Sequence, residues 1–259
     1  MSEPLIRFSE VSAGYRKSGP FASESSRVVN DLSFAIYPDE CLGLVGGSGS
    51  GKSTIARLLT GLLEPAEGQI FYQNQELTKL SFKERLQATG TGIQMVFQDP
   101  FSSLNANLTV GYQLEEPLLL RGEKDSAKRE QKARGMLSKV GLDQGCYRRY
   151  PTELSGGQLQ RIAIACALLM DPSLLVADEP VSALDVSVQA RVLDLFRVLL
   201  KEEHLSCLFI SHDLDVIYYL CDRVLVLESG RIVEAGRVEE IYQNPQHPYT
   251  KNLLAAVRD

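Results

Sequence analysis

The residues best suited to chemistry form a glycine-rich loop in the first quarter of the chain. Residues 46–53 read GGSGSGKS and fit the pattern GxxxxGK[ST], with an apolar run at 42–45 before them and a helical pattern after them. Glycines let the backbone curl so that its N–H groups point at phosphate oxygens, and the amino end of the helix adds a favourable dipole. A flexible linker is the alternative, but the flanking strand and helix argue against it.

Two side chains of this loop have distinct expected roles. Lys52 would bridge the β- and γ-phosphates of a nucleoside triphosphate, and the Ser53 hydroxyl would ligate Mg²⁺. We therefore expect a nucleoside triphosphate and Mg²⁺ as ligands. The expected nucleotide contacts of this segment come from Gly46, Gly47, Ser48, Gly49, Ser50, Gly51, Lys52, Ser53 and Thr54.

A second candidate is a pair of carboxylates that ends an apolar run. Asp178 and Glu179 follow residues 174–177, which read LLVA. A buried parallel strand delivers its last residues to the sheet edge where nucleotide sites form. Asp178 is suited to hold Mg²⁺ through its water shell, and Glu179 to polarise an attacking water. A strand that ends in Asp-Glu is more often solvated, so the functional reading depends on its pairing with the phosphate loop.

A third candidate is LSGGQ at residues 154–158, which opens a helical pattern. A Gly/Ser turn at a helix start is a potential second phosphate cradle. Taken alone, it is better explained as an ordinary helix start that is capped by Ser155.

Apolar runs indicate the elements that position these residues. The runs at 42–45, 92–97, 174–177, 207–210 and 224–227 predict strands buried on both faces, and helical patterns lie between some of them. One helical pattern continues from Ile55 through Leu62 and Leu63, and another runs from Val188 to Leu199. We expect a mainly parallel sheet that is covered by helices.

Other segments predict additions to this α/β core. Residues 99–160 hold helical stretches but no convincing strand, which indicates an inserted helical subdomain. Runs at 5–8, 28–37 and 68–73 predict antiparallel strands, and the polar stretch 17–27 predicts a loop. Near the end, SGRIVEAG predicts a hairpin, which a short helix and the turn-rich NPQHPY follow.

The composition excludes several classes of protein. The 259 residues are 44% hydrophobic and 23% charged, with a net charge of -6, which argues against a general nucleic-acid binder. The longest apolar run, 162–170, is about half of what a membrane span requires, and the amino end is unlike a secretory signal. The five cysteines show no CxxC spacing, so we expect buried free thiols in a cytoplasmic protein.

The phosphate loop, LSGGQ and the Asp-Glu strand, in this order and spacing, resemble the nucleotide-binding domain of ABC transporters over essentially the whole chain. LSGGQ is the signature of that family and is far more specific than the loop alone. The resemblance implies an α/β fold: a P-loop NTPase with an ABC-type core, an antiparallel β subdomain and an inserted α-helical subdomain. The expected division is 1–98 and 161–235 for the core with its β subdomain, 99–160 for the helical subdomain and 236–259 for a carboxyl-terminal tail.

Four further residues match this family by position. Tyr15 resembles the aromatic residue that stacks on adenine, although a tyrosine at a strand edge is the alternative. Gln98 resembles the glutamine that touches Mg²⁺ and water, and Asp185 resembles part of a loop that links two ATP sites. His212 resembles the switch histidine at the γ-phosphate; a lone histidine is usually structural, but this one follows a strand and precedes Asp213.

The resemblance also implies how two subunits share ATP. Each ATP would lie between the phosphate loop of one subunit and the signature turn of the other, closed head to tail. The implied catalytic residues are Glu179, His212 and Gln98, and the implied Mg²⁺ ligands are Ser53, Gln98 and Asp178. The residues implied for the partner's ATP site are Ser155, Gly156, Gly157, Gln158 and Asp185. All of these residues are present, so we expect an active ATPase.

The tail narrows the expected transporter. Residues 244–254, NPQHPYTKNLL, resemble the carboxyl-terminal signature of ATPases from dipeptide, oligopeptide and nickel importers, although a turn before a final helix would also explain them. Residues 150–168 resemble the second of the two ATPase paralogues of those importers. This implies a heterodimer, with a homodimer as the alternative, two permease subunits, an extracytoplasmic binding protein and a position at the cytoplasmic face of a bacterial inner membrane.

The cargo, the contact with the permease and the general function each carry an expectation of their own. Longer members of that family continue with a cysteine cluster, whereas no cysteine follows Cys221, so we expect no iron–sulfur centre and lean slightly toward a metal or metallophore cargo over a peptide. Phe101 and Leu104 are candidates for contact with the permease. The alternative function is a soluble ABC ATPase that acts on nucleic acid or ribosomes, but no long coiled coil or second cassette is visible.

Overall fold

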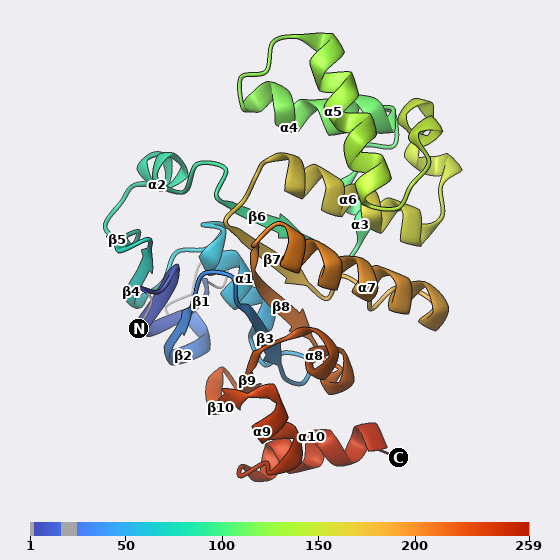
Figure 1. Cartoon of the computed structure of the whole chain (residues 1–259). Coiled ribbons are helices and arrows are strands. Elements are labelled where there is room, and N and C mark those ends of the chain that lie inside the picture. Colours follow the sequence, from blue (N-terminus) through green and yellow to red (C-terminus); the bar gives the residue numbers. More distant parts are fainter. Residues whose placement is uncertain (1–2, 17–24, 259) are drawn as a thin grey trace.

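The computed structural model describes residues 3–16 and 25–258. Strands build two sheets, one of four strands and one of six (Figure 1). The first sheet is antiparallel, in the order β2-β1-β4-β5, and the second is ordered β10-β9-β3-β8-β7-β6. The strands are β1 Ile6–Arg16, β2 Ser25–Ile36, β3 Cys41–Val45, β4 Glu67–Tyr72, β5 Gln75–Glu76, β6 Ile93–Val96, β7 Leu174–Asp178, β8 Ser206–Ser211, β9 Arg223–Glu228 and β10 Arg231–Arg237.

The six-stranded sheet carries the predicted α/β core. Strands β9, β3, β8, β7 and β6 are parallel neighbours, and β10 adds an antiparallel edge. Strands β3 and β8 are buried along their whole length, as their unbroken apolar runs predict. The carboxyl ends of β3, β7 and β8 therefore meet at one edge, where the residues that follow them come together.

Helices cover this sheet and form a separate lobe (Figure 1). The α4–α5 pair lies at one end of the molecule, and α9 and α10 lie at the opposite end. The helices are α1 Lys52–Leu59, α2 Phe82–Thr89, α3 Pro100–Ser103, α4 Val110–Leu120, α5 Ser126–Lys139, α6 Gly156–Leu169, α7 Val186–Glu202, α8 Leu214–Leu220, α9 Val238–Gln243 and α10 Pro248–Arg258, with short 3-10 helices at Gln144–Arg148 and Pro151–Glu153.

Three apolar clusters hold these layers together. One packs α6, α7 and α8 on a face of the six-stranded sheet, and another fills the space between the two sheets around α1. The third is the core of the helical lobe, where α4 and α5 pack on α6. No helix of the described part is long and apolar enough to cross a membrane. Four of the five cysteines are buried free thiols, as expected, and Cys166 is half-buried.

The structure departs from the sequence expectations at three places. The helix after the phosphate loop ends at Leu59 and not at Leu63, because Gly61 takes a left-handed backbone (φ 72°) and leaves Leu62 exposed. Residues 25–27 belong to β2 and not to a loop, because they pair with β1; the remainder of that predicted loop, 17–24, lies outside the described residues. The expected boundary at residue 160 falls inside α6, which runs unbroken and packs in the lobe core.

Candidate active site

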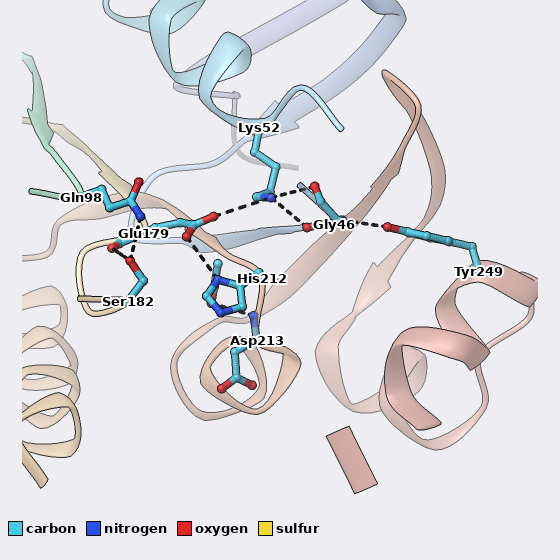
Figure 2. Close-up of polar contacts among 10 residues, drawn as sticks. Gly46, Lys52, Gln98, Glu179, Ser182, His212, Asp213 and Tyr249 are labelled. Carbon is cyan, nitrogen blue, oxygen red and sulfur yellow. Dashed lines mark hydrogen bonds and ion pairs between the residues drawn. The ribbon is translucent and has the colours of Figure 1, made fainter. Parts of the chain in front are cut away.

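A cavity of about 400 Å³ opens at the carboxyl edge of the six-stranded sheet. Its lining joins the phosphate loop to residues that follow three other strands: Gln98 after β6, Glu179 after β7 and His212 after β8 (Figure 2). These residues are spread over positions 48 to 212 of the sequence, and the parallel register of the strands brings them together. The lining residues are Val28, Ser48, Gly49, Ser50, Gly51, Lys52, Ser53, Thr54, Gln98, Glu179 and His212.

The loop can wrap phosphate only because its glycines occupy positions closed to other residues. Gly51 has φ 108°, and a Cβ on it would lie 2.7 Å from Val29 Cγ1. Lys52 follows as the first residue of α1, with its side chain 7% exposed. Its Nζ donates to the carbonyl oxygens of Gly46 (2.8 Å) and Gly47 (3.1 Å) and lies 3.7 Å from Glu179 Oε1 (Figure 2). The ammonium thus faces the cavity and is held at its base.

Glu179 occupies a strained backbone position at the centre of the site. Its φ is 46°, in the left-handed region that a non-glycine residue rarely adopts, and its N–H donates to Ile210 O at 3.0 Å. The carboxylate reaches Lys52 on one side, and on the other its Oε2 lies 3.2 Å from His212 Nδ1. The backbone turn therefore aims this carboxylate into the cavity.

Ser182 connects the glutamine to this carboxylate segment. Gln98 Nε2 donates to Ser182 Oγ at 3.2 Å, and Ser182 Oγ donates to the backbone carbonyl of Glu179 at 3.0 Å (Figure 2). Gln98 is exposed and directly precedes α3, the first helix of the lobe. The chain of contacts ties the start of the helical lobe to the residue best placed to activate water.

The residues present fit Mg²⁺. Asp178 Oδ1 is buried and has no hydrogen-bond partner among the described residues. Burial raises the pKa of this carboxyl, and a hydrogen bond from the Ser53 hydroxyl opposes that shift. A hydroxyl and a desolvated carboxylate oxygen side by side are ligands that a hard divalent cation prefers.

Tyr15 lies near the loop helix, at the edge of the site. Its Oη lies 3.5 Å from Thr54 Oγ1 and accepts a hydrogen bond from Arg57 Nη1 at 2.9 Å. The side chain is 38% exposed, which leaves surface that could stack on a base.

Gly46 and Gly47 contact other parts of the fold, β9 and the tail respectively. Neither is among the described residues that line the cavity. A Cβ on Gly46 would lie 2.2 Å from Leu227 O, so this glycine is required by close packing on β9. Gly47 contacts Tyr249 of the tail, and its N–H donates to Tyr249 Oη at 2.7 Å (Figure 2).

The signature residues form a second, separate group. Ser155 and Gln158 make a capping box at the start of α6: each side chain accepts from the other residue's backbone N–H. A Cβ on Gly157 would lie 2.3 Å from Val188 Cγ1, so the turn packs closely on α7, which Asp185 precedes. None of the described cavity-lining residues comes from this group.

Sequence reasoning missed Val28, Ser182 and Arg57. Ser182 lies three residues after Glu179, and this short separation could have indicated it once Glu179 was identified as a candidate. The contacts of Val28 and Arg57 come from a strand pairing and a helix face that the short motifs do not encode.

This geometry can move a phosphoryl group to water. Phosphoryl transfer needs little covalent help, and positioning with charge stabilisation supplies most of the rate. Lys52 and the loop N–H groups can neutralise phosphate charge, while Glu179 and His212 lie where they can orient a water.

Comparisons with known proteins agree with this chemistry. A family model described as "ABC transporter" matches residues 29–182. The oligopeptide transport ATP-binding protein OppF of Haemophilus influenzae is 46% identical over 90% of this chain and 70% of its own. The dipeptide transport ATP-binding protein DppF of Escherichia coli is 45% identical over 99% of this chain and 77% of its own.

Solved structures show the same fold. The ATP-binding cassette MJ0796, in a dimeric post-hydrolysis state with ADP and phosphate, superposes with a TM-score of 0.80 at 28% identity, over 90% of this chain and 99% of its own. CbiO1 of Clostridium perfringens gives a TM-score of 0.81 at 24% identity, over 94% and 92%. The predicted ABC-type α/β fold and ATPase activity are confirmed, and the alternative of an ATPase acting on nucleic acid or ribosomes is not favoured. The chain belongs to the ABC transporter family, and it is one of that family's ATP-hydrolysing subunits.

Proposed function

We propose that this protein hydrolyses ATP to drive the uptake of dipeptides or oligopeptides, as a subunit of a bacterial importer at the cytoplasmic face of the inner membrane. The relatives at 45–46% identity are ATP-binding proteins of oligopeptide and dipeptide transport, and their similarity extends over 90–99% of this chain. These two relatives favour peptide over a metal or metallophore cargo.

A single observation carries the mechanism: the two halves of an ATP site lie apart within one chain. The cavity holds the loop, Gln98, Glu179 and His212, while the signature turn is a separate surface at the α6 amino end. Ser155 of that turn is exposed, and the amino end of a helix suits it to phosphate. We infer that ATP is closed between this cavity and the signature turn of a second subunit, a paralogous ATPase, with a second copy of this chain as the alternative.

Within that closed site each residue would have a defined role. Lys52 holds the triphosphate, and Ser53, Asp178 and Gln98 would hold Mg²⁺, which supplies neutralising charge to the phosphates. Glu179 orients the water and accepts its proton, and His212 holds that carboxylate and contacts the terminal phosphate. Tyr15 would stack on the base.

The groove beside Gln98 is the proposed contact for the permease. A cavity of about 280 Å³ lies between β6 and the helices of the lobe, and Phe97, Leu104 and Leu120 are among its lining residues. Phe97 (43%) and Leu120 (71%) are exposed. The proposed occupant is a short cytoplasmic helix of a permease subunit, because an apolar groove receives the apolar face of a helix. Gln98 would report its position to the ATP site through Ser182.

Phe101→Asp tests this contact. Phe101 is outside the groove lining but lies on α3, whose Ser103 belongs to that lining; it is 59% exposed, so a charge there changes the surface and not the fold. We expect co-purification with the permeases and coupled ATPase activity to fall at least about tenfold, as for a lost apolar anchor. Leu62→Asp, with similar exposure (61%) away from the groove, is the matched control. Wild-type assembly and transport by the Phe101 variant would refute the docking proposal.

Reconstitution tests the proposed function as a whole. The complete importer, with both ATPases, the two permeases and the extracytoplasmic binding protein, is placed in vesicles with radiolabelled dipeptide, oligopeptide or a nickel chelate. We expect ATP-dependent peptide uptake that Glu179→Gln abolishes. Uptake of the nickel chelate without peptide would overturn the peptide assignment, and co-purified nucleic acid without permease would overturn the transport function.

A further inference from the structure

The tail motif NPQHPY lines no described part of the nucleotide cavity, yet it is fixed firmly to the fold. Glu234 of β10 accepts hydrogen bonds from the backbone N–H groups of Gln246 (2.7 Å) and His247 (3.0 Å). The N–H of Tyr249 donates to His247 Nδ1 at 3.3 Å. Beyond the turn, Leu254 of α10 is 3% exposed and joins the apolar cluster on the sheet. These contacts give the first residues of α10 a defined position.

That position delivers one side chain to the phosphate loop. Tyr249 Oη accepts the N–H of Gly47 at 2.7 Å, across 202 residues of sequence (Figure 2). A Cβ on Gly47 would lie 3.1 Å from the same oxygen, a tight contact that the tyrosine would relieve by shifting a few tenths of an ångström. The contact comes from behind the loop, since Gly47 is outside the described cavity lining.

The Gly47 peptide group begins the turn that wraps the phosphates. Its carbonyl accepts from Lys52 Nζ (3.1 Å) and from the N–H of Ser50 (3.3 Å), while its N–H is held by the tail. Lys52 is also the group that would bind the triphosphate, so its contacts with the Gly46 and Gly47 carbonyls can change when ATP binds. The tyrosine hydroxyl lies outside the described cavity lining, so its contact with Gly47 need not change.

We propose that Tyr249 is a positioning residue for ATP binding: its hydroxyl holds the phosphate loop in its binding shape from outside the nucleotide cavity. Part of the carboxyl-terminal tail thereby belongs to the ATP site. A loop that is ordered before binding costs less to order at binding, so the tail raises ATP affinity without touching ATP. The proposal rests on ATP hydrolysis alone and is independent of the cargo.

Tyr249→Phe removes only the hydroxyl and tests this role in the full chain. We expect the Kd and KM for ATP to rise about two- to tenfold, the range that one neutral hydrogen bond supplies, with kcat within about twofold of wild type. Amide hydrogen exchange of the peptide containing Gly47 should become faster. The matched control is Tyr242→Phe, which removes a tail hydroxyl that donates to Asp215 at 2.6 Å, with no expected change in these quantities.

A second variant separates loop positioning from general packing. Glu234→Ala frees the turn that places Tyr249, so it should raise KM and loop exchange in the same direction, and it should add little when combined with Tyr249→Phe. Unchanged KM and loop exchange in Tyr249→Phe would overturn the proposal. So would a fall in melting temperature and kcat at constant KM, or full additivity of the two variants.

Discussion

Glu179 combines three properties at one residue: a left-handed backbone, a lysine neighbour and a histidine neighbour. Positive φ in a non-glycine residue costs free energy that a fold sustains only where the surrounding structure imposes it, and such residues cluster at functional sites. Here the N–H bond to Ile210 O anchors the turn, which points the carboxylate at the cavity. The strained backbone of Glu179 is therefore what places its carboxylate at the cavity.

Glu179→Gln should abolish turnover and leave ATP binding intact. The amide keeps the shape and the hydrogen-bonding reach of the carboxylate but cannot accept a proton, so we expect kcat to fall about a hundredfold or more. Turnover is measured by ATPase assays, and ATP binding by equilibrium binding of a fluorescent ATP analogue. Glu228→Gln is the control, because that half-buried residue ends strand β9 of the same sheet and is outside the described cavity lining. Near-normal turnover by the Glu179 variant would rule out the assigned role.

At the scale of elements, the start of α6 depends on a close approach to α7. Gly157 leaves room for Val188, whose Cγ1 would be 2.3 Å from an added Cβ, and a valine in a helix has little freedom to rotate away. Gly156, its neighbour, faces Leu184 Cδ2 at 3.5 Å, which is ordinary contact. Packing on α7 therefore requires glycine at position 157 but not at position 156.

Gly157→Ala should destabilise the protein by about 1–3 kcal/mol, the usual cost of an overpacked contact. Gly156→Ala should stay within about 0.5 kcal/mol of wild type, as for a substitution that meets no obstacle. Denaturant unfolding measures both. Adding Val188→Ala to Gly157→Ala should recover most of the loss, and a failure to recover it would place the damage elsewhere than at this contact.

Elements with strong apolar patterns could be predicted, and those without could not. The buried strands can be recognised in the sequence because both of their faces are apolar, as in β3 and β8. Helix α2 was not anticipated, since its sequence FKERLQAT is mostly polar, and only the capping box of Ser81 and Glu84 marks it. The end of α1 was placed too late because Leu62 and Leu63 continue the helical spacing past Gly61, whose left-handed backbone the spacing does not encode.

Short motifs single out candidate residues of the site, but they do not predict the contacts between them. Short motifs identify Lys52, Asp178 and Glu179 because each chemistry needs particular groups beside a strand end. The contact between Gly47 and Tyr249 joins the two ends of the sequence, and it exists only because β10 and the tail turn set α10 beside the loop. Such a contact depends on tertiary placement, which no local pattern specifies.

At the scale of the whole molecule, the chain presents two incomplete phosphate-binding surfaces. The cavity offers a lysine and loop N–H groups, and the α6 amino end offers a capped turn with exposed Ser155. In the proposed pair of paralogous subunits, each surface would face its complement on the other subunit, and two similar sandwiches would form. Each triphosphate then has a complete shell only in the dimer, so ATP itself would favour closure.

This arrangement predicts that Ser155→Arg separates binding from closure. With Glu179→Gln as the background, so that ATP persists, the protein mixed with its paralogous ATPase should double in mass by light scattering on addition of ATP and Mg²⁺. Ser155 is outside the described lining of the chain's own cavity, so the added arginine should leave ATP binding to the single chain unchanged. Its bulk at the capped turn should nevertheless block the sandwich at the partner's loop and prevent the mass increase.

Lys52→Ala is the converse control. This variant should lose ATP binding by the single chain, because the Lys52 ammonium faces the cavity where the phosphates would bind. An ATP-induced dimer that forms equally well with Ser155→Arg would mean that the signature turn does not close over ATP.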